Sequence, residues 1–192
     1  NMLDLGGIPL YSEERGEDDP LILAGGPNSS YPEPIADFFD VIVIGDGEEA
    51  LPKITELWKE RESRVQILRR IAQEVPGAYV PRFYRFHYGE DGILQEIEAT
   101  DGAPEKIKKA IVSDFENVYY PMKPVVPYAE VVHDRINLEI MRGCPHRCRF
   151  CHAVMFKNKL RFRTVETLLN QAETVYNNTG YESMALTSLS SG

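Results

Sequence analysis

Cysteine is scarce in this chain of 192 residues, and its three cysteines all lie between positions 144 and 151. An odd number of cysteines in so short a segment makes a poor disulfide framework, and it is more typical of a metal site. The absence of cysteine elsewhere also favours a reducing compartment, so we expect a cytoplasmic protein.

Basic residues are outnumbered by acidic ones. The chain has 21 Lys and Arg against 30 Asp and Glu, which gives a formal net charge of −9. Such a chain repels phosphate backbones unless it keeps a local basic patch, so binding to nucleic acid is not indicated. Long apolar runs are missing as well. None approaches the roughly 20 residues of a membrane-spanning helix, and we expect no membrane association.

The two ends of the sequence indicate a fragment. The chain opens with Asn1 and Met2 and has no leader of the charged-then-apolar kind. It stops at Gly192, directly after an apolar run that is typical of a strand. We therefore expect an internal piece of a longer protein, whose remaining segments complete any site that begins here.

The first part of the chain has the pattern of an α/β domain. Residues 41–44 (Val-Ile-Val-Ile) predict a strand buried on both faces of a parallel sheet. Residues 45–47 (Gly-Asp-Gly) then turn the chain into a predicted helix, with Glu48 and Glu49 in its first turn. The expected buried side of this helix consists of Ile54, Leu57 and Trp58.

Two further helices are predicted around this strand. Residues 34–39 predict one or two helical turns. Ser63 followed by Gln66 has the spacing of a capping box and predicts another helix, which residues 75–77 (Val-Pro-Gly) end. The expected apolar face of that helix is Val65, Leu68 and Ile71.

The middle of the chain has a different texture. Alternating apolar and polar residues on both sides of residues 89–92 (Gly-Glu-Asp-Gly) predict a β-hairpin. The alternating residues are Tyr84, Phe86 and Tyr88 before the turn, and Ile93, Gln95 and Ile97 after it. Prolines at positions 121, 124 and 127 then predict a connector that runs over a surface.

The last part of the chain predicts a β-α-β unit. Residues 136–141 predict a strand that leads into the cysteines, and residues 184–187 predict the next strand. Between them, residues 164–176 predict a helix that Thr164 caps. The expected inward face of this helix is Val165, Leu168, Leu169, Ala172 and Val175.

The cysteine segment has a spacing that suits an iron–sulfur cluster. Cys144, Cys148 and Cys151 are arranged as C-x3-C-x2-C. Three thiolates from one short loop can hold three irons of a cubane 4Fe–4S cluster and leave the fourth iron without a protein ligand. A small chelating cofactor can fill that open position, and S-adenosylmethionine (SAM) has the amino and carboxylate groups to do so.

This segment resembles the signature of the radical SAM superfamily, and Phe150, the aromatic residue before the third cysteine, matches as well. The resemblance implies that the loop follows the first strand of a partial (β/α) barrel. It implies an enzyme that holds a 4Fe–4S cluster and cleaves SAM reductively to start radical chemistry on a substrate the sequence does not identify. An electron donor such as flavodoxin or ferredoxin would then be a partner.

The resemblance also implies a SAM-binding turn after the second strand of the barrel. In the family a Gly-rich turn at this place holds the SAM amino group through its backbone. Here the place is taken by Ser190, Ser191 and Gly192. The alternative interpretation of these residues is an ordinary strand-end turn.

The N-terminal part resembles the second half of a cobalamin-binding-type domain, which precedes the radical SAM domain in one large branch of the superfamily. The similar segments are residues 25–34 and 41–48, and residues 1–9, 32–38 and 133–135 are similar to an uncharacterised group of that branch. Methyl transfer, methylthiolation and rearrangement all stay open as the reaction. Cobalamin would be a further cofactor, with backbone contacts at Gly25, Gly26, Gly45 and Gly47, unless these are only strand-end turns.

Taken together, these patterns predict three regions in an α/β chain. Residues 1–76 would be the C-terminal part of a Rossmann-like, cobalamin-binding-type parallel sheet. Residues 77–132 would be the hairpin and the proline-rich connector. Residues 133–192 would be the first β-α-β unit of a radical SAM partial barrel.

Other interpretations of the same residues remain. His146 or His152 could join the three thiolates in a zinc site of a non-catalytic interaction module. A ferredoxin would need a fourth cysteine, which the chain lacks. A basic stripe after the loop could contact a substrate or SAM carboxylate, or could simply be a solvated face. It consists of Lys157, Lys159, Arg161 and Arg163.

Overall fold

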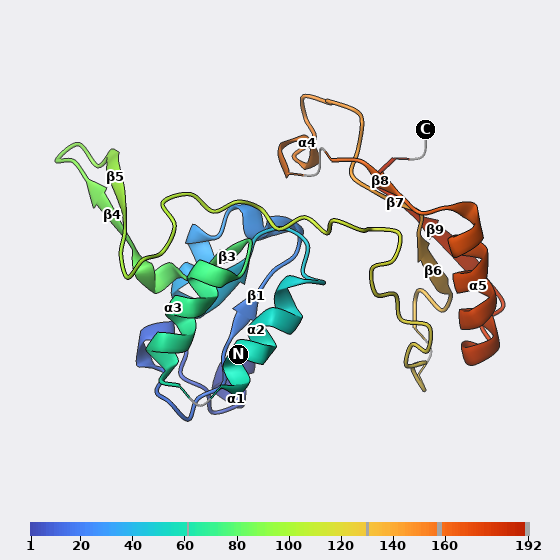
Figure 1. Ribbon diagram of the computed structural model, residues 1–192, viewed down its shortest axis with the longest axis horizontal. Helices are drawn as coiled ribbons and strands as arrows, with labels where there is room; N and C mark the ends of the chain where they lie inside the picture. The colour runs from blue at the N-terminus through green and yellow to red at the C-terminus, as the bar shows by residue number, and fades with distance from the viewer. Residues whose placement is uncertain (61, 130, 157–158, 191–192) are drawn as a thin grey trace. The chain divides into compact units, whose positions relative to one another are not determined.

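The computed structural model describes residues 1–60, 62–129, 131–156 and 159–190 (Figure 1). It is a mixed α/β structure, and the chain divides into an N-terminal unit, Asn1–Val112, and a C-terminal unit, Ser113–Gly192. Across the described ranges, no helix combines the length and the hydrophobicity that crossing a membrane requires.

The N-terminal unit is built on a sheet with strand order β1-β2-β3. The strands are β1 (Leu23–Ala24), β2 (Val41–Val43) and β3 (Ala78–Tyr79). All three residues of β2 are buried, and β2 pairs in parallel with β1, as predicted. The sheet is nevertheless mixed, because β3 is antiparallel to β2. Two helices connect β2 to β3. The first helix returns the chain to the end of the sheet where β2 begins, and the second brings it back to the end where β2 stops. The strand β3 therefore runs in the opposite direction to β2.

These two helices are α2 (Ala50–Lys59) and α3 (Arg64–Glu74), and their apolar faces pack in the core of the unit. The capping box of Ser63 and Gln66 forms as predicted. The predicted inward residues Ile54, Leu57, Leu68 and Ile71 are buried, and Trp58 packs partly buried against them.

Two predictions for these helices are wrong. Val65 is 42% exposed and Ile67 is buried instead, so the face of α3 that meets the core is Ile67, Leu68, Ile71 and Ala72. The helix α2 begins at Ala50, so Glu48 and Glu49 precede the first turn and do not occupy it. The segment predicted at 34–39 is helical, but as the tighter 3-10 helix η3 (Glu33–Phe38).

A buried ion cluster fastens the N-terminal segment to the sheet. One carboxylate oxygen of Asp40 accepts hydrogen bonds from Arg15 at 3.0 Å and from the Ile22 amide at 2.8 Å, and it forms an ion pair with Arg64 at 3.0 Å. Both guanidinium groups also donate to backbone carbonyls of residues 9–20, and Arg15 donates in addition to Phe38. The segment held in this way contains the 3-10 helix η1 (Ser12–Glu14), and the helix α1 (Met2–Leu5) precedes it.

The remaining elements of the unit are two short 3-10 helices and a β-hairpin. The 3-10 helices η2 (Pro27–Ser30) and η4 (Pro81–Phe83) lie after β1 and β3. The predicted hairpin is confirmed as β4 (Tyr84–Tyr88) paired antiparallel with β5 (Leu94–Ala99), with an irregularity between His87 and Tyr88. Figure 1 shows this hairpin projecting from the rest of the N-terminal unit.

The C-terminal unit contains the predicted β-α-β arrangement. Its parts are β6 (Ile136–Glu139), α5 (Val165–Thr179) and β9 (Met184–Thr187), and the two strands pair in parallel. The core consists of Ile136, Leu138, Ala172 and Val175, with Tyr120, Leu168 and Tyr181 packed against it. Before β6, residues 113–129 and 131–135 form neither helix nor strand, as expected from their prolines.

The inward face of α5 differs from the prediction at two positions. Val165 and Leu169 are exposed, and Gln171 is buried. The face toward the sheet is therefore Leu168, Gln171, Ala172 and Val175, which has the spacing of one helical stripe. Thr164 caps the helix as predicted, by accepting the Thr167 amide.

Candidate functional site

The three cysteines lie on a loop whose two ends are held together. Residues 143–160, called the cysteine loop from here on, run from β7 (Met141–Arg142) to β8 (Arg161–Phe162) and include α4 (Ala153–Phe156). The two strands pair antiparallel, with Met141 opposite Phe162 and Arg142 opposite Arg161. This pair is called the neck of the loop. In Figure 1 the loop leaves β7, extends away from the sheet and returns to β8.

The strand predicted at 136–141 is interrupted, and the interruption creates the neck. Ile140 lies between β6 and β7 and belongs to neither. Its amide donates to Thr187 at 3.1 Å, and its carbonyl accepts the Arg163 amide at 3.0 Å. One residue thus connects the end of β9, the end of β6 and the segment just after β8.

Gly143 is the first residue of the cysteine loop, and its backbone touches the returning chain. Its φ is +101°, and a Cβ at this position would lie 2.3 Å from the Lys159 carbonyl oxygen and 3.1 Å from Leu160 Cα. Only glycine permits this conformation together with so close an approach. Gly143 was not among the predicted site residues, although a glycine directly before the first cysteine is a sequence signal for such a turn.

The cysteines themselves are free thiols. Cys144 and Cys151 are partly buried and Cys148 is exposed. The Cys151 amide donates to the Cys148 carbonyl at 3.0 Å, so one tight turn separates these two residues. Among the residues that the structure describes, no three His, Cys, Asp or Glu side chains gather closely enough to hold a metal ion. Three unpaired thiols on one loop are nevertheless the donor set that a cubane cluster requires.

The other predicted cofactor residues are only partly placed. Phe150 is 92% exposed on the cysteine loop. Ser190 is partly buried and follows β9, where its carbonyl accepts the Ser188 hydroxyl at 3.0 Å. Ser191 and Gly192 lie outside the described residues. Because β6 and β9 are parallel, the cysteine loop and the turn at 188–190 leave the sheet at the same edge.

The predicted basic stripe does not form a solvated face. Arg163 is 7% exposed, and its guanidinium carbon lies 4.6 Å from the centre of the buried Phe115 ring. Arg161 lies 5.7 Å from the same ring, and Arg142 lies 4.9 Å from it. Lys159 is exposed, and Lys157 lies outside the described residues. Phe115 and these three arginines, called the Phe115 cluster, therefore lie at the neck.

Two carboxylates hold Arg142 and the start of the following helix. Glu139 binds Arg142 through two hydrogen bonds, of 2.9 and 2.7 Å. Glu116 accepts from the Thr164 amide at 2.9 Å and its hydroxyl at 2.6 Å, and also from the Thr167 hydroxyl. The hydrogen bonds from Thr164, followed by those from Thr167, lower the pKa of Glu116, and the Arg163 charge adds to the effect. Sequence reasoning missed this second cap because Glu116 is distant along the chain.

The two histidines proposed as zinc ligands are not gathered with the thiols. His146 is exposed on the cysteine loop. The His152 ring lies edge-on to Phe156, with 5.1 Å between the ring centres. Neither histidine belongs to a metal-binding group within the described part of the chain.

Another segment of the chain packs directly against the turn that follows β2. Gly45 has a φ of +116°, and a Cβ there would lie 2.1 Å from the Ala110 carbonyl oxygen. Asp46 and Ala110 complete the contact, because the Asp46 amide donates to Ala110 and the Ala110 amide donates to Ile44. Gly45, which the resemblance placed beside a cobalamin tail, thus packs against residues 109–110.

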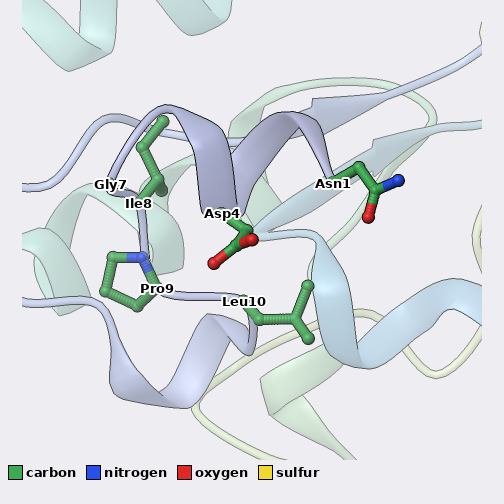
Figure 2. Close-up of a pocket in the computed structure, with 6 residues that line it drawn as sticks. All are labelled: Asn1, Asp4, Gly7, Ile8, Pro9 and Leu10. Carbon is green, nitrogen blue, oxygen red and sulfur yellow. The ribbon is translucent and has the colours of Figure 1, made fainter.

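A separate hollow lies in the N-terminal unit (Figure 2). It is lined by Asn1, Asp4, Gly7, Ile8, Pro9 and Leu10. In Figure 2 the side chains of Asp4 and Asn1 are the polar groups around it. The hollow contains none of the residues that the sequence predicts for a cofactor.

Comparison with known proteins places two segments in described families. Residues 1–81 match a family model described as radical SAM proteins, N-terminal. Residues 138–190 match a model described as the radical SAM superfamily, and this segment contains the whole cysteine loop.

One relative has been found among curated proteins, and it comes from Methanocaldococcus jannaschii, where it is described as uncharacterized. It is 26% identical over 162 residues, which are 83% of this chain and 29% of the relative. The chain thus spans less than a third of the length of that relative. No solved structure matches the chain.

Proposed function

Because the chain belongs to the radical SAM superfamily, we propose that Cys144, Cys148 and Cys151 hold a 4Fe–4S cluster that activates SAM. The chain would then supply the cofactor-binding part of a radical SAM enzyme. The observation that carries this proposal is the placement of three free thiols on one loop at the carboxyl edge of the β6–β9 pair. Ligands bind at this edge of parallel sheets.

The cysteines have the right chemistry for three of the four irons. Thiolates are the usual protein ligands of such clusters, and three of them leave one iron accessible to SAM. When bound, a cluster of this kind supplies one electron that breaks the sulfonium carbon–sulfur bond of SAM and yields a carbon radical.

The other residues of the chain would position and shield the cofactors. The neck fixes the backbone beside Cys144, and the backbone turn between Cys148 and Cys151 would keep the last two ligands on one turn of the loop. Phe150 is exposed next to Cys151, where its ring would cover the bound cluster. Ser190, three residues after the end of β9, would present backbone groups to the SAM amino group from the same edge of the sheet.

The test is metal analysis after anaerobic reconstitution with iron and sulfide. We expect on the order of four irons per chain and a broad visible absorbance band, as for a cubane cluster. Single replacements Cys144→Ala, Cys148→Ala and Cys151→Ala should abolish or strongly weaken both. The proposal is wrong if all three variants keep a full cluster.

Zinc content and two histidine variants separate this proposal from the zinc module. His146→Ala and His152→Ala leave the three thiols in place, so both should bind iron like the unchanged protein. A structural zinc site would behave in the opposite way. It would hold one zinc per chain and would lose it when the ligating histidine is removed.

A further inference from the structure

We infer that Phe115 is a positioning residue for the cysteine loop. Its ring holds together the arginines at the two ends of that loop. This inference rests on the proposed function, because the purpose of the positioning is to present Cys144 to the cluster. Phe115 lies well before the loop in the sequence, and neither of the matched segments contains it.

The geometry of the neck creates a need for such a residue. Arg142 and Arg161 are directly opposite each other in the β7–β8 pair. Like charges at directly opposed positions of an antiparallel pair destabilise the pairing. The neck has only two residues in each strand, so it has little backbone pairing with which to resist this repulsion.

Phe115 offers one attractive surface to both arginines. The guanidinium carbons of Arg142 and Arg161 lie 4.9 and 5.7 Å from its ring centre, within the range of a cation–π contact. The bidentate pair with Glu139 holds Arg142 in this place. The ring thus binds the outgoing and the returning strand at the same time.

The ring itself is fixed. Phe115 is 3% exposed, and Arg163 approaches it at 4.6 Å while donating to the Glu116 carbonyl at 3.2 Å. Glu116 is in turn bound to Thr164, the cap of α5, and to Thr167 in its first turn. Phe115 is therefore anchored to the end of α5 that faces the neck, and it cannot follow the loop if the loop moves.

A change at the neck would be transmitted to the first cysteine. Cys144 follows Arg142 by two residues, a distance of at most about 7 Å along the chain. A slip of one residue in the β7–β8 pairing would also turn the following side chains to the opposite face. Holding Arg142 opposite Arg161 therefore fixes both the position and the direction of Cys144.

The test compares Phe115→Leu with Phe83→Leu. Both phenylalanines are 3% exposed, so both changes remove the same buried ring, but only Phe115 contacts the arginines of the neck. The first measurement is amide hydrogen exchange in the metal-free chain, over residues 141–142 and 161–163. We expect about tenfold faster exchange there in Phe115→Leu, from the loss of two cation–π contacts, and no change in Phe83→Leu.

The second measurement is the half-life of the reconstituted cluster against a chelator, together with the electron paramagnetic resonance spectrum of the reduced cluster. Phe115→Leu should shorten the half-life several-fold and broaden the spectrum, because Cys144 takes several positions. A variant that matches Phe83→Leu in both measurements overturns the inference.

Two controls keep the result interpretable. Protection of α5 shows whether Phe115→Leu is folded, and if it is not, Phe115→Met fills the buried site with a flexible apolar side chain that has no ring, and should accelerate exchange at residues 141–142 in the same way. A chain that takes up no iron at all refutes the proposed function, whereas the exchange measurement on metal-free protein still decides whether Phe115 holds the neck.

Discussion

The α-carbon of Gly143 faces the carbonyl oxygen of Lys159 so closely that a Cβ at Gly143 would lie 2.3 Å from that oxygen. The contact joins the first residue of the cysteine loop to its returning strand without any side chain. The left-handed φ of Gly143 and this backbone contact leave glycine as the residue that fits this position.

Gly143→Ala is therefore expected to weaken cluster binding. The matched control is Gly180→Ala at the end of α5, where φ is +72° and no atom lies within 4 Å of the added methyl group. Gly180→Ala should lower stability by about 1 kcal/mol through backbone strain alone and leave the iron content unchanged. Gly143→Ala should lower stability further and reduce the iron bound per chain. Equal iron in both variants would show that the close approach has no part in positioning Cys144.

The buried Asp40 should carry a large share of the stability of the N-terminal unit. Asp40→Asn leaves the buried guanidinium groups of Arg15 and Arg64 without their shared carboxylate, which should cost about 3–5 kcal/mol. The only tryptophan, Trp58, lies in this unit, so its fluorescence during denaturant unfolding reports the change. The control is Asp101→Asn, which breaks the exposed pair with Arg69 and should cost less than about 1 kcal/mol.

The lowered pKa of Glu116 predicts an acid-sensitive start of α5. A carboxyl group whose pKa is lower in the folded protein stabilises the fold above its unfolded pKa, and this stabilisation is lost as the pH falls through the folded pKa. The protection of the amides of residues 165–168, taken relative to the intrinsic exchange rate at each pH, should therefore fall as the pH is lowered from 4.5. In Glu116→Gln this pH dependence should be largely absent. Glu166→Gln, in the exposed first turn of the same helix, should keep it.

Phe150 should protect the cluster without being needed to bind it. The side chain is 92% exposed, so Phe150→Ala removes no packing from the core and should fold and bind iron normally. On exposure to air, the variant should lose its visible absorbance faster than the unchanged protein, because the ring would no longer exclude oxygen and water. Tyr119→Ala, another exposed aromatic residue of this unit, serves as the control. Identical bleaching rates in the two variants would remove Phe150 from the site.

Features that depend on neighbouring residues could be predicted from the sequence. The capping box of Ser63 with Gln66 and the cap of Thr164 on α5 are bonds between residues three positions apart. The buried run that became β2 and the hairpin β4–β5 likewise follow from local hydrophobic patterns. The spacing of the cysteines is also local, which is why the loop could be recognised before its structure was known.

Features that depend on distant residues could not be predicted. Glu116 reaches Thr164 and Phe115 reaches Arg142 only because the chain folds back on itself, and a single sequence has no pattern for such contacts. The antiparallel direction of β3 depends on the number of helices that precede it. The outward positions of Val65 and Leu169 depend on how their helices rotate against the core, which periodicity alone leaves uncertain by one position.

The neck has a consequence for how this site can vary in length. The β7–β8 pair joins the two ends of the cysteine loop. The pairing in the neck therefore offsets the entropy cost of closing the loop, and β6, α5 and β9 do not have to. That cost grows slowly, by only about 0.6 kcal/mol for each doubling of a flexible loop. Residues can therefore be added beyond Cys151 without shifting the strands that carry the sheet. The neck thus allows the length of the cysteine loop to change without changing the sheet. The surroundings of the same three thiols can then differ while β6, α5 and β9 keep their places.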